Sequence, residues 1–306
     1  MTLYVGALPE GNGDALAPWR YDEGVKIDFH VHIFPTWVAE EMEDLCRREP
    51  AFSSMYRGRR AAIADHRQLL QAMDEAGIEA SVALGFAWRD QGLCRRHNDY
   101  LLEAAAVSGG RIIPFCTVNM GAPGAAAELE RCARGGARGV GELRPEDQGW
   151  CLNGPQGEEL AWLARRWGLI LTFHVSEPVG HGYPGKGGLA LSSFFRFASA
   201  HPHVTLVASH LGGGLPFFAH MPEVRELCRR IYFDTAACPF LYSPSAYRQV
   251  VELVGAERLL FGSDFPLLSP ARVMGHLAQA TLEEGEMEAI VGKNAVGLLG
   301  YVDSRS

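Results

Sequence analysis

Several features are missing from this chain, and each absence argues against a class of function. No apolar run approaches the roughly 20 residues that a membrane-spanning helix needs, so no membrane span is predicted. Residues 1–4 hold no basic stretch followed by an apolar one, so no secretory signal is expected. The formal net charge is -8, so the chain lacks the excess of basic residues that binding to nucleic acid or an anionic membrane needs.

Paired cysteines and a dinucleotide-binding turn are also missing. The seven cysteines are odd in number and none forms a C-x-x-C pair, which is typical of a reduced, cytoplasmic protein. No G-x-G-x-x-G turn follows the first predicted strand, which argues against an open, doubly wound sheet. With 47% hydrophobic and 21% charged residues, the composition is that of a globular protein with a substantial core.

What the chain does contain is a regular alternation of apolar strands and helices. Asp65 and Gly77 supply the start and stop signals of the first such helix. Eight strand and helix units in 306 residues predict a single (β/α)8 TIM barrel, because near-continuous apolar strands fit a parallel sheet buried on both faces. The predicted strands are 26–32, 79–86, 111–118, 139–143, 169–175, 204–210, 231–237 and 259–265; the helices are 65–77, 93–107, 125–134, 157–167, 189–200, 215–229, 244–254 and others at the C-terminus.

Two segments lie outside this alternation. Residues 1–24 carry Gly, Pro and Asp without periodicity and are interpreted as an N-terminal surface extension, which leaves 25–306 as the barrel domain. Residues 33–64 form a long insertion after the first strand, and insertions of this length are typically lids or contact surfaces. The insertion is also where we would expect a homodimer to form. Its basic run, 57–60, is equally compatible with a solvated loop.

The first predicted strand ends in His30-Val31-His32. Side chains alternate along a strand, so both histidines point the same way, about 7 Å apart along the chain. Two imidazoles on one face can bind a single metal ion, since histidine is the commonest neutral ligand of zinc and related metals. The alternative is a structural pair at a strand end. Histidines inside predicted helices, such as His97, are interpreted as structural.

Other strands end in residues that also bind metals. The carboxyl ends of barrel strands meet at one mouth, so residues at those ends should converge on the same place. The remaining ligand-type residues at strand ends are Glu142, His174, His210 and Asp264. Together with His30 and His32 they predict a site for a divalent metal.

These residues also carry a family resemblance. The His30-x-His32 pair, His174, His210, the segment LFGSDFP at 260–266 and the segment KNAVGLL at 293–299 resemble the amidohydrolase superfamily. The chain is most similar to the amidohydrolase-2 branch, which includes the aminocarboxymuconate-semialdehyde decarboxylase group. The resemblance runs from about residue 26 to the C-terminus.

The resemblance implies a role for each ligand-type residue. His30, His32 and His174 would hold a divalent metal, expected to be zinc, with Asp264 as a further ligand and proton acceptor. His210 would be the catalytic base or a ligand of a second metal. Glu142 could bridge two ions, bind substrate beside one ion, or form a salt bridge with Arg144. One metal is favoured over two.

Polar residues in two loops are candidates for binding a small-molecule substrate. The loop at 177–187 offers His181, Tyr183 and Lys186, and the segment after the fourth strand offers Arg144 and Trp150. Arg144 could hold a substrate carboxylate through two hydrogen bonds, although it could equally neutralise Glu142. The alternative is that His181, Tyr183 and Lys186 are ordinary residues of a surface loop.

Three functions are compatible with this set of residues. The first is a hydrolase in which a metal-activated water attacks a small amide, ester or lactone. The second is a metal-dependent, non-oxidative decarboxylase of an unsaturated or aromatic carboxylic acid, in which His210 and Asp264 handle protons. The third is a non-catalytic, metal-binding barrel protein. A bridging Glu142 would favour the hydrolase, and a single metal with a free His210 would favour the decarboxylase.

Overall fold

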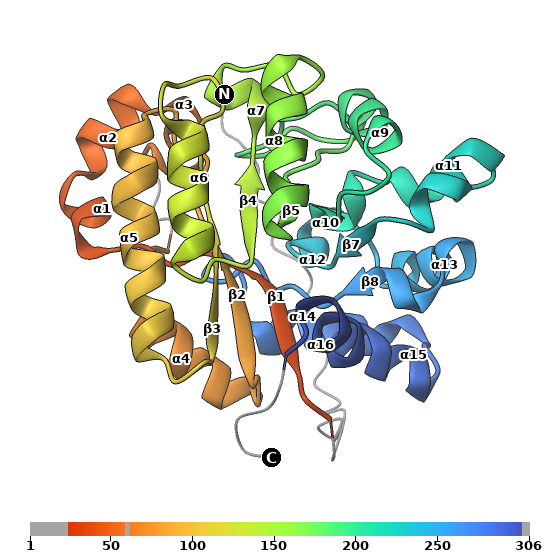
Figure 1. Ribbon diagram of the computed structural model, residues 1–306. Coiled ribbons are helices and arrows are strands. Elements are labelled where there is room, and N and C mark those ends of the chain that lie inside the picture. Colours follow the sequence, from red (N-terminus) through yellow and green to blue (C-terminus); the bar gives the residue numbers. More distant parts are fainter. Residues whose placement is uncertain (1–23, 59–61, 302–306) are drawn as a thin grey trace, which may run out of the picture.

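The computed structural model describes residues 24–58 and 62–301. Within these ranges, eight parallel strands form one sheet in chain order, and helices flank it on the outside (Figure 1). The first and last strands meet, because the Phe29 N–H donates to the Phe261 carbonyl at 2.7 Å and the His32 N–H donates to the Phe265 carbonyl at 2.7 Å. The predicted TIM barrel is therefore confirmed. The predicted extension 1–24, apart from residue 24, lies outside the described residues, as does part of the basic run at 57–60.

Each strand lies within a predicted apolar segment, although β6, β7 and β8 are much shorter than predicted. Nearly all strand residues are buried, as expected for a sheet covered on both faces. Their bounds are β1 Ile27–Val31, β2 Ala80–Leu84, β3 Ile112–Cys116, β4 Gly139–Leu143, β5 Ile170–Phe173, β6 Leu206–Ala208, β7 Tyr232–Asp234 and β8 Leu259–Leu260.

The helices follow from the same periodicity and capping signals. In α4 the Asp65 carboxylate accepts the backbone N–H groups of Arg67 and Gln68, and Gly77 ends the helix at a φ of 66°. The helix bounds are α1 Thr36–Glu40, α2 Met42–Arg48, α3 Pro50–Tyr56, α4 His66–Ala76, α5 Gln91–Val107, α6 Ala125–Arg134, α7 Pro145–Gln148, α8 Pro155–Trp167, α9 Leu191–Ala200, α10 Ser209–Gly212, α11 Pro222–Cys228, α12 Cys238–Leu241, α13 Ser245–Val254, α14 Pro270–Leu277, α15 Glu284–Glu288 and α16 Asn294–Leu299.

One predicted helix is divided in two. The segment 215–229 forms a 3-10 turn at Leu215–Phe218, and α11 begins only at Pro222. Proline has no N–H to donate within a helix, but it fits the first helical position well. The prediction of one continuous helix was therefore wrong.

The insertion after β1 is packed rather than loose. Its helices α1 to α3 lie at the same end of the barrel as α7 (Figure 1). Phe34, Leu45 and Phe52 form an apolar cluster with Phe86 and Trp88, which follow β2. This cluster fixes α3 beside the mouth of the barrel.

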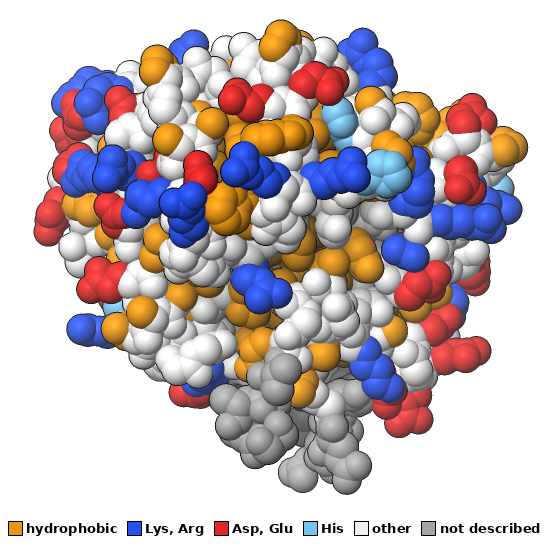
Figure 2. Space-filling view, in the orientation of Figure 1, with side chains coloured by type: hydrophobic (Ala, Val, Ile, Leu, Met, Phe, Trp, Pro, Cys, Tyr) orange, Lys and Arg blue, Asp and Glu red, His pale blue; other side chains and the backbone are white. Residues whose placement is uncertain are grey.

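The surface is mixed in charge. On the face shown in Figure 2, basic and acidic side chains lie among apolar ones. Among the described residues, no helix has the length and apolarity that crossing a membrane would take.

Candidate metal centre

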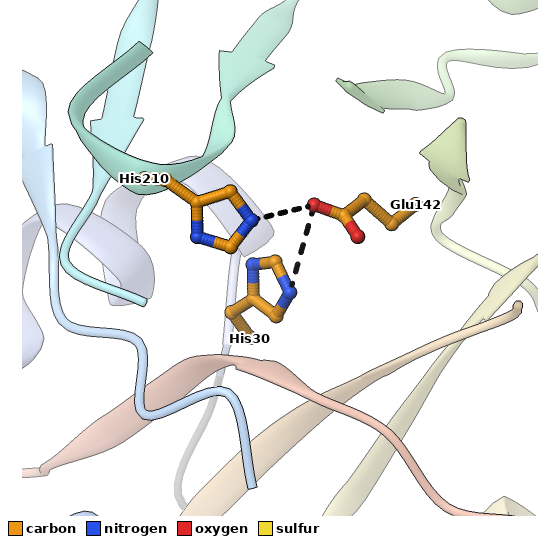
Figure 3. A group of neighbouring side chains, drawn as sticks. All are labelled: His30, Glu142 and His210. Atoms are coloured by element: carbon orange, nitrogen blue, oxygen red, sulfur yellow. Dashed lines mark ion pairs between the residues drawn. The ribbon is translucent and has the colours of Figure 1, made fainter. Parts of the chain in front are cut away.

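The carboxyl ends of five strands bring all six predicted ligand residues to one place. His30 lies on β1 and Glu142 on β4, and His32 and His174 directly follow β1 and β5. His210 lies in α10 after β6, and Asp264 lies in the loop after β8. His30 is fully buried, and Glu142 and His210 are each under a tenth exposed. In Figure 3, the rings of His30 and His210 both face one carboxylate oxygen of Glu142. That oxygen lies 3.2 Å from His210 Nε2 and 3.9 Å from His30 Nε2.

His210 reaches this position through a tight turn. His210 and Leu211 have φ values of 59° and 51°, a left-handed conformation that side chains seldom adopt. The turn is held by Asp234 on β7, whose Oδ1 accepts the His210 N–H at 2.8 Å. Glycines at 212 and 213 continue it, with a positive φ at both positions.

The hydrogen bonds of three histidines define which ring nitrogen carries the proton. Each Nδ1 faces an acceptor: Asp234 Oδ2 at 2.8 Å from His30, the Leu84 carbonyl at 3.3 Å from His32, and the Ala236 carbonyl at 2.9 Å from His210. Each Nδ1–H therefore donates outward, and each Nε2 lone pair points into the cluster.

His174 presents its other nitrogen to the cluster. The Ser176 hydroxyl donates to the Gly187 carbonyl, so its oxygen accepts the His174 Nε2–H at 3.1 Å. His174 Nδ1 then carries the lone pair and lies 3.1 Å from both Glu142 Oε1 and His210 Nε2.

Acceptor nitrogens therefore face one another across the site. His30 Nε2 and His32 Nε2 are 3.2 Å apart, and neither bears a proton when both rings are neutral with the proton on Nδ1. Asp264 Oδ1 lies 3.6 Å from the first nitrogen and 3.5 Å from the second. Lone pairs and carboxylate oxygens packed this closely need a cation between them, and nitrogen with oxygen donors suits a divalent metal. The donor set thus fits the predicted metal.

Two groups of three residues have donor atoms close enough to share an ion. One is His30, Glu142 and His210; the other is His30, His32 and Asp264; within each group the donor atoms lie within 4.8 Å of one another. His30 belongs to both groups, and its one free nitrogen can bind only one ion, so the two groups describe overlapping positions. Burial raises the pKa of Asp264 to about 6, against the opposing effect of His30.

The carboxylates attract positive charge into the cluster. Burial lowers the pKa of His32 to about 3, so its ring is neutral. Burial acts in the same direction on His30 and His210, yet Asp234 and Glu142 raise the pKa of His30 to about 9, and Glu142 raises that of His210 to about 10. The site therefore favours a cation, whether a proton or a metal ion.

A cavity of about 520 Å³ opens directly on this cluster. Of the predicted substrate-binding residues, Arg144, His181 and Tyr183 line it. The cluster contributes His32, Glu142, His174, His210 and Asp264, and the other lining residues are Met55, Tyr56, Ala62, Phe86, Ala87, Pro184, Gly185, Ala237, Phe240, Leu241, Pro266 and Leu267.

Two of the predicted substrate-binding residues do not line the cavity. Trp150 is buried in the main core, where its indole N–H donates to Gln148 at 3.3 Å, because the short helix α7 turns the chain inward before it. The Lys186 ammonium donates to the carbonyls of Val179 at 2.7 Å and His181 at 3.0 Å, and so is used within its own loop.

The predicted pairing of Arg144 with Glu142 is not found either. The Arg144 Nε–H donates to Asp147 Oδ2 at 2.6 Å, one helical turn further along the chain. Glu142 instead faces the histidines. This leaves Glu142 available to a metal and Arg144 available to the cavity.

The sequence assigns no role to Asp234, yet its carboxylate contacts both the His30 ring and the His210 backbone. Its place at the end of β7, within the run 231–237, was the one available signal. The apolar lining from α3, including Met55, was also missed, since no pattern within the insertion indicates which side chains face the mouth.

Comparison with known proteins gives a family match over most of the chain. The model of the amidohydrolase family matches residues 27–301. A 6-methylsalicylic acid decarboxylase of Penicillium expansum is 28% identical over 134 residues, which is 34% of this chain and 40% of that relative, so the match spans less than half the relative's length.

Solved structures share the fold. The 5-carboxyvanillate decarboxylase of Sphingomonas paucimobilis superposes with a TM-score of 0.75 at 18% identity, covering 92% of this chain and all of that one. A dihydroxybenzoic acid decarboxylase of Polaromonas sp. JS666, with bound manganese and the inhibitor 2-nitroresorcinol, gives a TM-score of 0.68 at 20% identity, covering 91% and 97%. The family match, the closed barrel and the histidines at its strand ends lead to one conclusion: the chain belongs to the amidohydrolase family, in its amidohydrolase-2 branch.

Proposed function

We propose that the protein is a divalent-metal-dependent, non-oxidative decarboxylase of an aromatic or unsaturated carboxylic acid. The observation that carries this proposal is the largely apolar cavity of about 520 Å³ that opens directly on five ligand-type side chains. A flat, apolar acid fits such a cavity with its carboxylate against the metal centre. The relative and the two structural neighbours named above are decarboxylases, which supports decarboxylation over hydrolysis as the reaction.

His30, His32, His174 and Asp264 would hold the metal, with Glu142 beside them and His210 free of it. A bound divalent cation would supply Lewis-acid polarisation of the substrate oxygens. We take zinc and manganese as the ions to test, because the donors suit both and one neighbour holds manganese.

The reaction requires one bond to break and one proton to be delivered. The bond between the substrate's ring or alkene carbon and its carboxylate carbon breaks, CO2 leaves, and the electron pair left on the carbon takes up a proton. His210 and Asp264 face the cavity, and we assign proton transfer to them. The apolar walls exclude water from the reacting carbon.

Turnover by the metal-loaded protein tests this function. We expect CO2 release from at least one member of a panel of hydroxybenzoic and unsaturated acids, with the proton appearing at the carbon that lost the carboxylate. Deuterium incorporation from D2O would report that position. Absence of CO2 release across the panel, with hydrolysis of an ester or lactone instead, would contradict the proposal.

Hydrolysis is the second candidate, and the position of Glu142 favours it. The carboxylate lies among four histidines, within 3.9 Å of a ring nitrogen of each, as a ligand shared by two ions would. Metal content per chain, compared between the wild type and Glu142→Gln, separates the two functions. Two equivalents falling toward one would favour hydrolysis, and one equivalent in both proteins would favour decarboxylation.

A further inference from the structure

We propose that Arg144 binds one anionic oxygen of the substrate through its Nη1 atom alone, and that the substrate is an aromatic acid with a single carboxylate and an otherwise apolar ring. This inference rests on the proposed function and narrows its substrate class. It comes from the hydrogen bonds of Arg144 and from the side chains around it.

The guanidinium of Arg144 has one unused nitrogen. The side chain is almost fully buried, at 2% exposure, and lines the cavity. Its Nε donates to Asp147 and its Nη2 donates to the Gly185 carbonyl at 2.7 Å. Nη1 is buried and has no hydrogen-bond partner among the described residues. A buried donor without a partner is unfavourable, so a ligand oxygen in the cavity would relieve that cost.

The same hydrogen bonds favour a contact to one oxygen over the two-pronged grip that the sequence suggested. Such a grip needs two parallel N–H groups, from Nη1 and Nη2 or from Nη2 and Nε. The Nε–H and one of the two Nη2 N–H groups are bound by protein acceptors, which leaves Nη1 as the nitrogen with both N–H groups unused. Arg144 therefore presents Nη1 to a substrate oxygen.

The guanidinium is also held in place. A Cβ atom built on Gly188 would lie 2.7 Å from Arg144 Nε and 2.9 Å from its Cζ, so the planar group lies against the backbone at Gly188. Arg144 lines the same cavity as Glu142 and His174. An oxygen on Nη1 would thus lie beside the metal centre.

The described part of the cavity lining offers an acid no second arginine or lysine. Among the described residues that line it, Arg144 is the one arginine or lysine, and Glu142 and Asp264 carry negative charge. The far walls are apolar: Met55, Phe86, Phe240, Leu241 and Leu267. A second carboxylate on the ring would be desolvated against these side chains without a hydrogen bond, which is strongly unfavourable.

Binding measurements with two acids that differ by one carboxylate test this inference without requiring turnover. The probes are salicylate and 4-hydroxyisophthalate, titrated calorimetrically into the metal-loaded full-length protein. We expect salicylate to bind at least about tenfold more tightly. We expect Arg144→Met to weaken salicylate binding by about 10- to 100-fold, since hydrogen bonds to charged groups contribute about 1.5–3 kcal/mol.

Two further variants separate loss of the anchor from loss of structure. Arg144→Lys keeps the charge and should recover part of the affinity for salicylate. Arg89→Met removes an exposed arginine at the same end of the barrel that does not line the cavity, and should leave affinity unchanged. If salicylate proves to be a substrate, Arg144→Met should raise KM more than it lowers kcat, because the contact forms before the reaction.

The possible outcomes are distinguishable. Equal affinity for the two acids, or equal affinity of Arg144→Met and Arg89→Met for salicylate, would overturn the inference. The expected binding pattern without CO2 release from any acid would contradict the proposed function and leave the anchor supported. If circular dichroism shows that Arg144→Met is unfolded, Arg144→Lys becomes the variant that tests the inference. Unchanged salicylate affinity in Arg144→Lys would then count against the anchor.

Discussion

His97 and the histidines at the mouth of the barrel are all largely buried, but they differ in whether both ring nitrogens have hydrogen-bond partners in the protein. His97, beneath the insertion, is completely buried. Its Nδ1 accepts the indole N–H of Trp88 at 3.0 Å and the backbone N–H of Phe86 at 3.3 Å, and its Nε2–H donates to the Ile33 carbonyl at 2.8 Å. Both nitrogens have protein partners, as in a structural histidine.

The histidines at the mouth of the barrel each have one satisfied nitrogen and one that faces other acceptors. His30 donates to Asp234, while its Nε2 lies 3.2 Å from His32 Nε2. Burial is similar in the two regions, so burial does not distinguish them. The orientation of the ring-nitrogen lone pairs therefore distinguishes the candidate metal site from the structural histidine. Four predictions test this difference.

The largest effect is expected from removing a converging nitrogen. His32→Asn keeps a polar side chain but removes an Nε2 donor from the cluster. We expect bound metal to be lost at micromolar metal concentrations, and turnover to fall by roughly three orders of magnitude, since metal polarisation contributes several kcal/mol. Metal analysis and initial rates measure both effects. His203→Asn, at an exposed histidine, is the control, and equal metal content in the two variants would contradict the assignment.

A smaller loss of metal affinity is expected when the ring proton of a ligand histidine moves to its other nitrogen and no ligand is removed. Asp234→Asn puts an amide N–H opposite His30 Nδ1, so the ring proton should move to Nε2 and occupy the lone pair that faces the cluster. We expect metal affinity to fall about 10- to 100-fold, as for other outer partners of metal-binding histidines.

The proton position itself can be measured in the metal-free protein above pH 9, where the His30 ring is neutral and carries one proton. Nitrogen-15 NMR of the histidine rings should show the His30 proton on Nδ1 in the wild type and on Nε2 in Asp234→Asn. Asp74→Asn, on the exposed surface of α4, is the matched control. Unaltered metal affinity in Asp234→Asn would show that Asp234 does not act through the tautomer.

His97 should affect stability, with a defined dependence on pH. Burial lowers its folded-state pKa from 6.5 to about 4, so the unfolded chain binds more protons between these values. The stability due to the neutral ring is therefore complete above pH 6.5 and is lost as the pH falls toward 4. Between pH 7 and pH 5 this amounts to about 2 kcal/mol.

Comparison of His97→Gln with the wild type isolates this contribution. We expect the variant to lose about 1–3 kcal/mol of unfolding free energy at pH 7, because Trp88 and Ile33 lose a partner. At pH 5 the difference should shrink by about 2 kcal/mol. Urea denaturation at both pH values measures it. A difference that does not change with pH would mean that His97 titrates normally in the folded state.

The smallest effect concerns the carboxylate among the histidines. Glu142→Gln removes a negative charge with almost no change of shape. If Glu142 lies beside a single ion, we expect metal content near one equivalent and affinity reduced by less than tenfold, a loss smaller than that of Asp234→Asn. Equilibrium dialysis against Mn²⁺ measures both quantities. Loss of all metal would make Glu142 an indispensable ligand.

The sequence predicted most of the fold because its signals are local. The caps of α4, at Asp65 and Gly77, and the apolar runs of the strands depend only on neighbouring residues. The helical structure of the insertion was not predicted, because its short helices are stabilised by Phe86 and Trp88 from another part of the chain. The continuous helix predicted over 215–229 ignored the position of Pro222.

The candidate site was predictable to the level of strand ends but no further. The ligand-type residues at 30, 142 and 210 could be placed together because strand ends meet in a barrel. The partners of Asp234 could not be predicted, since they depend on the register between β7, β6 and β1. The partner of Arg144 is Asp147 rather than Glu142, because the turn of α7 brings the later carboxylate to its Nε.

The central claim is that converging lone pairs at the mouth of the barrel bind a divalent cation. Metal content per chain, measured by mass spectrometry after dialysis with Zn²⁺ or Mn²⁺ at neutral pH, tests it most directly. We predict at least one tightly held equivalent in the wild type and none in His32→Asn. A folded wild-type protein that holds no metal after this treatment would contradict the claim.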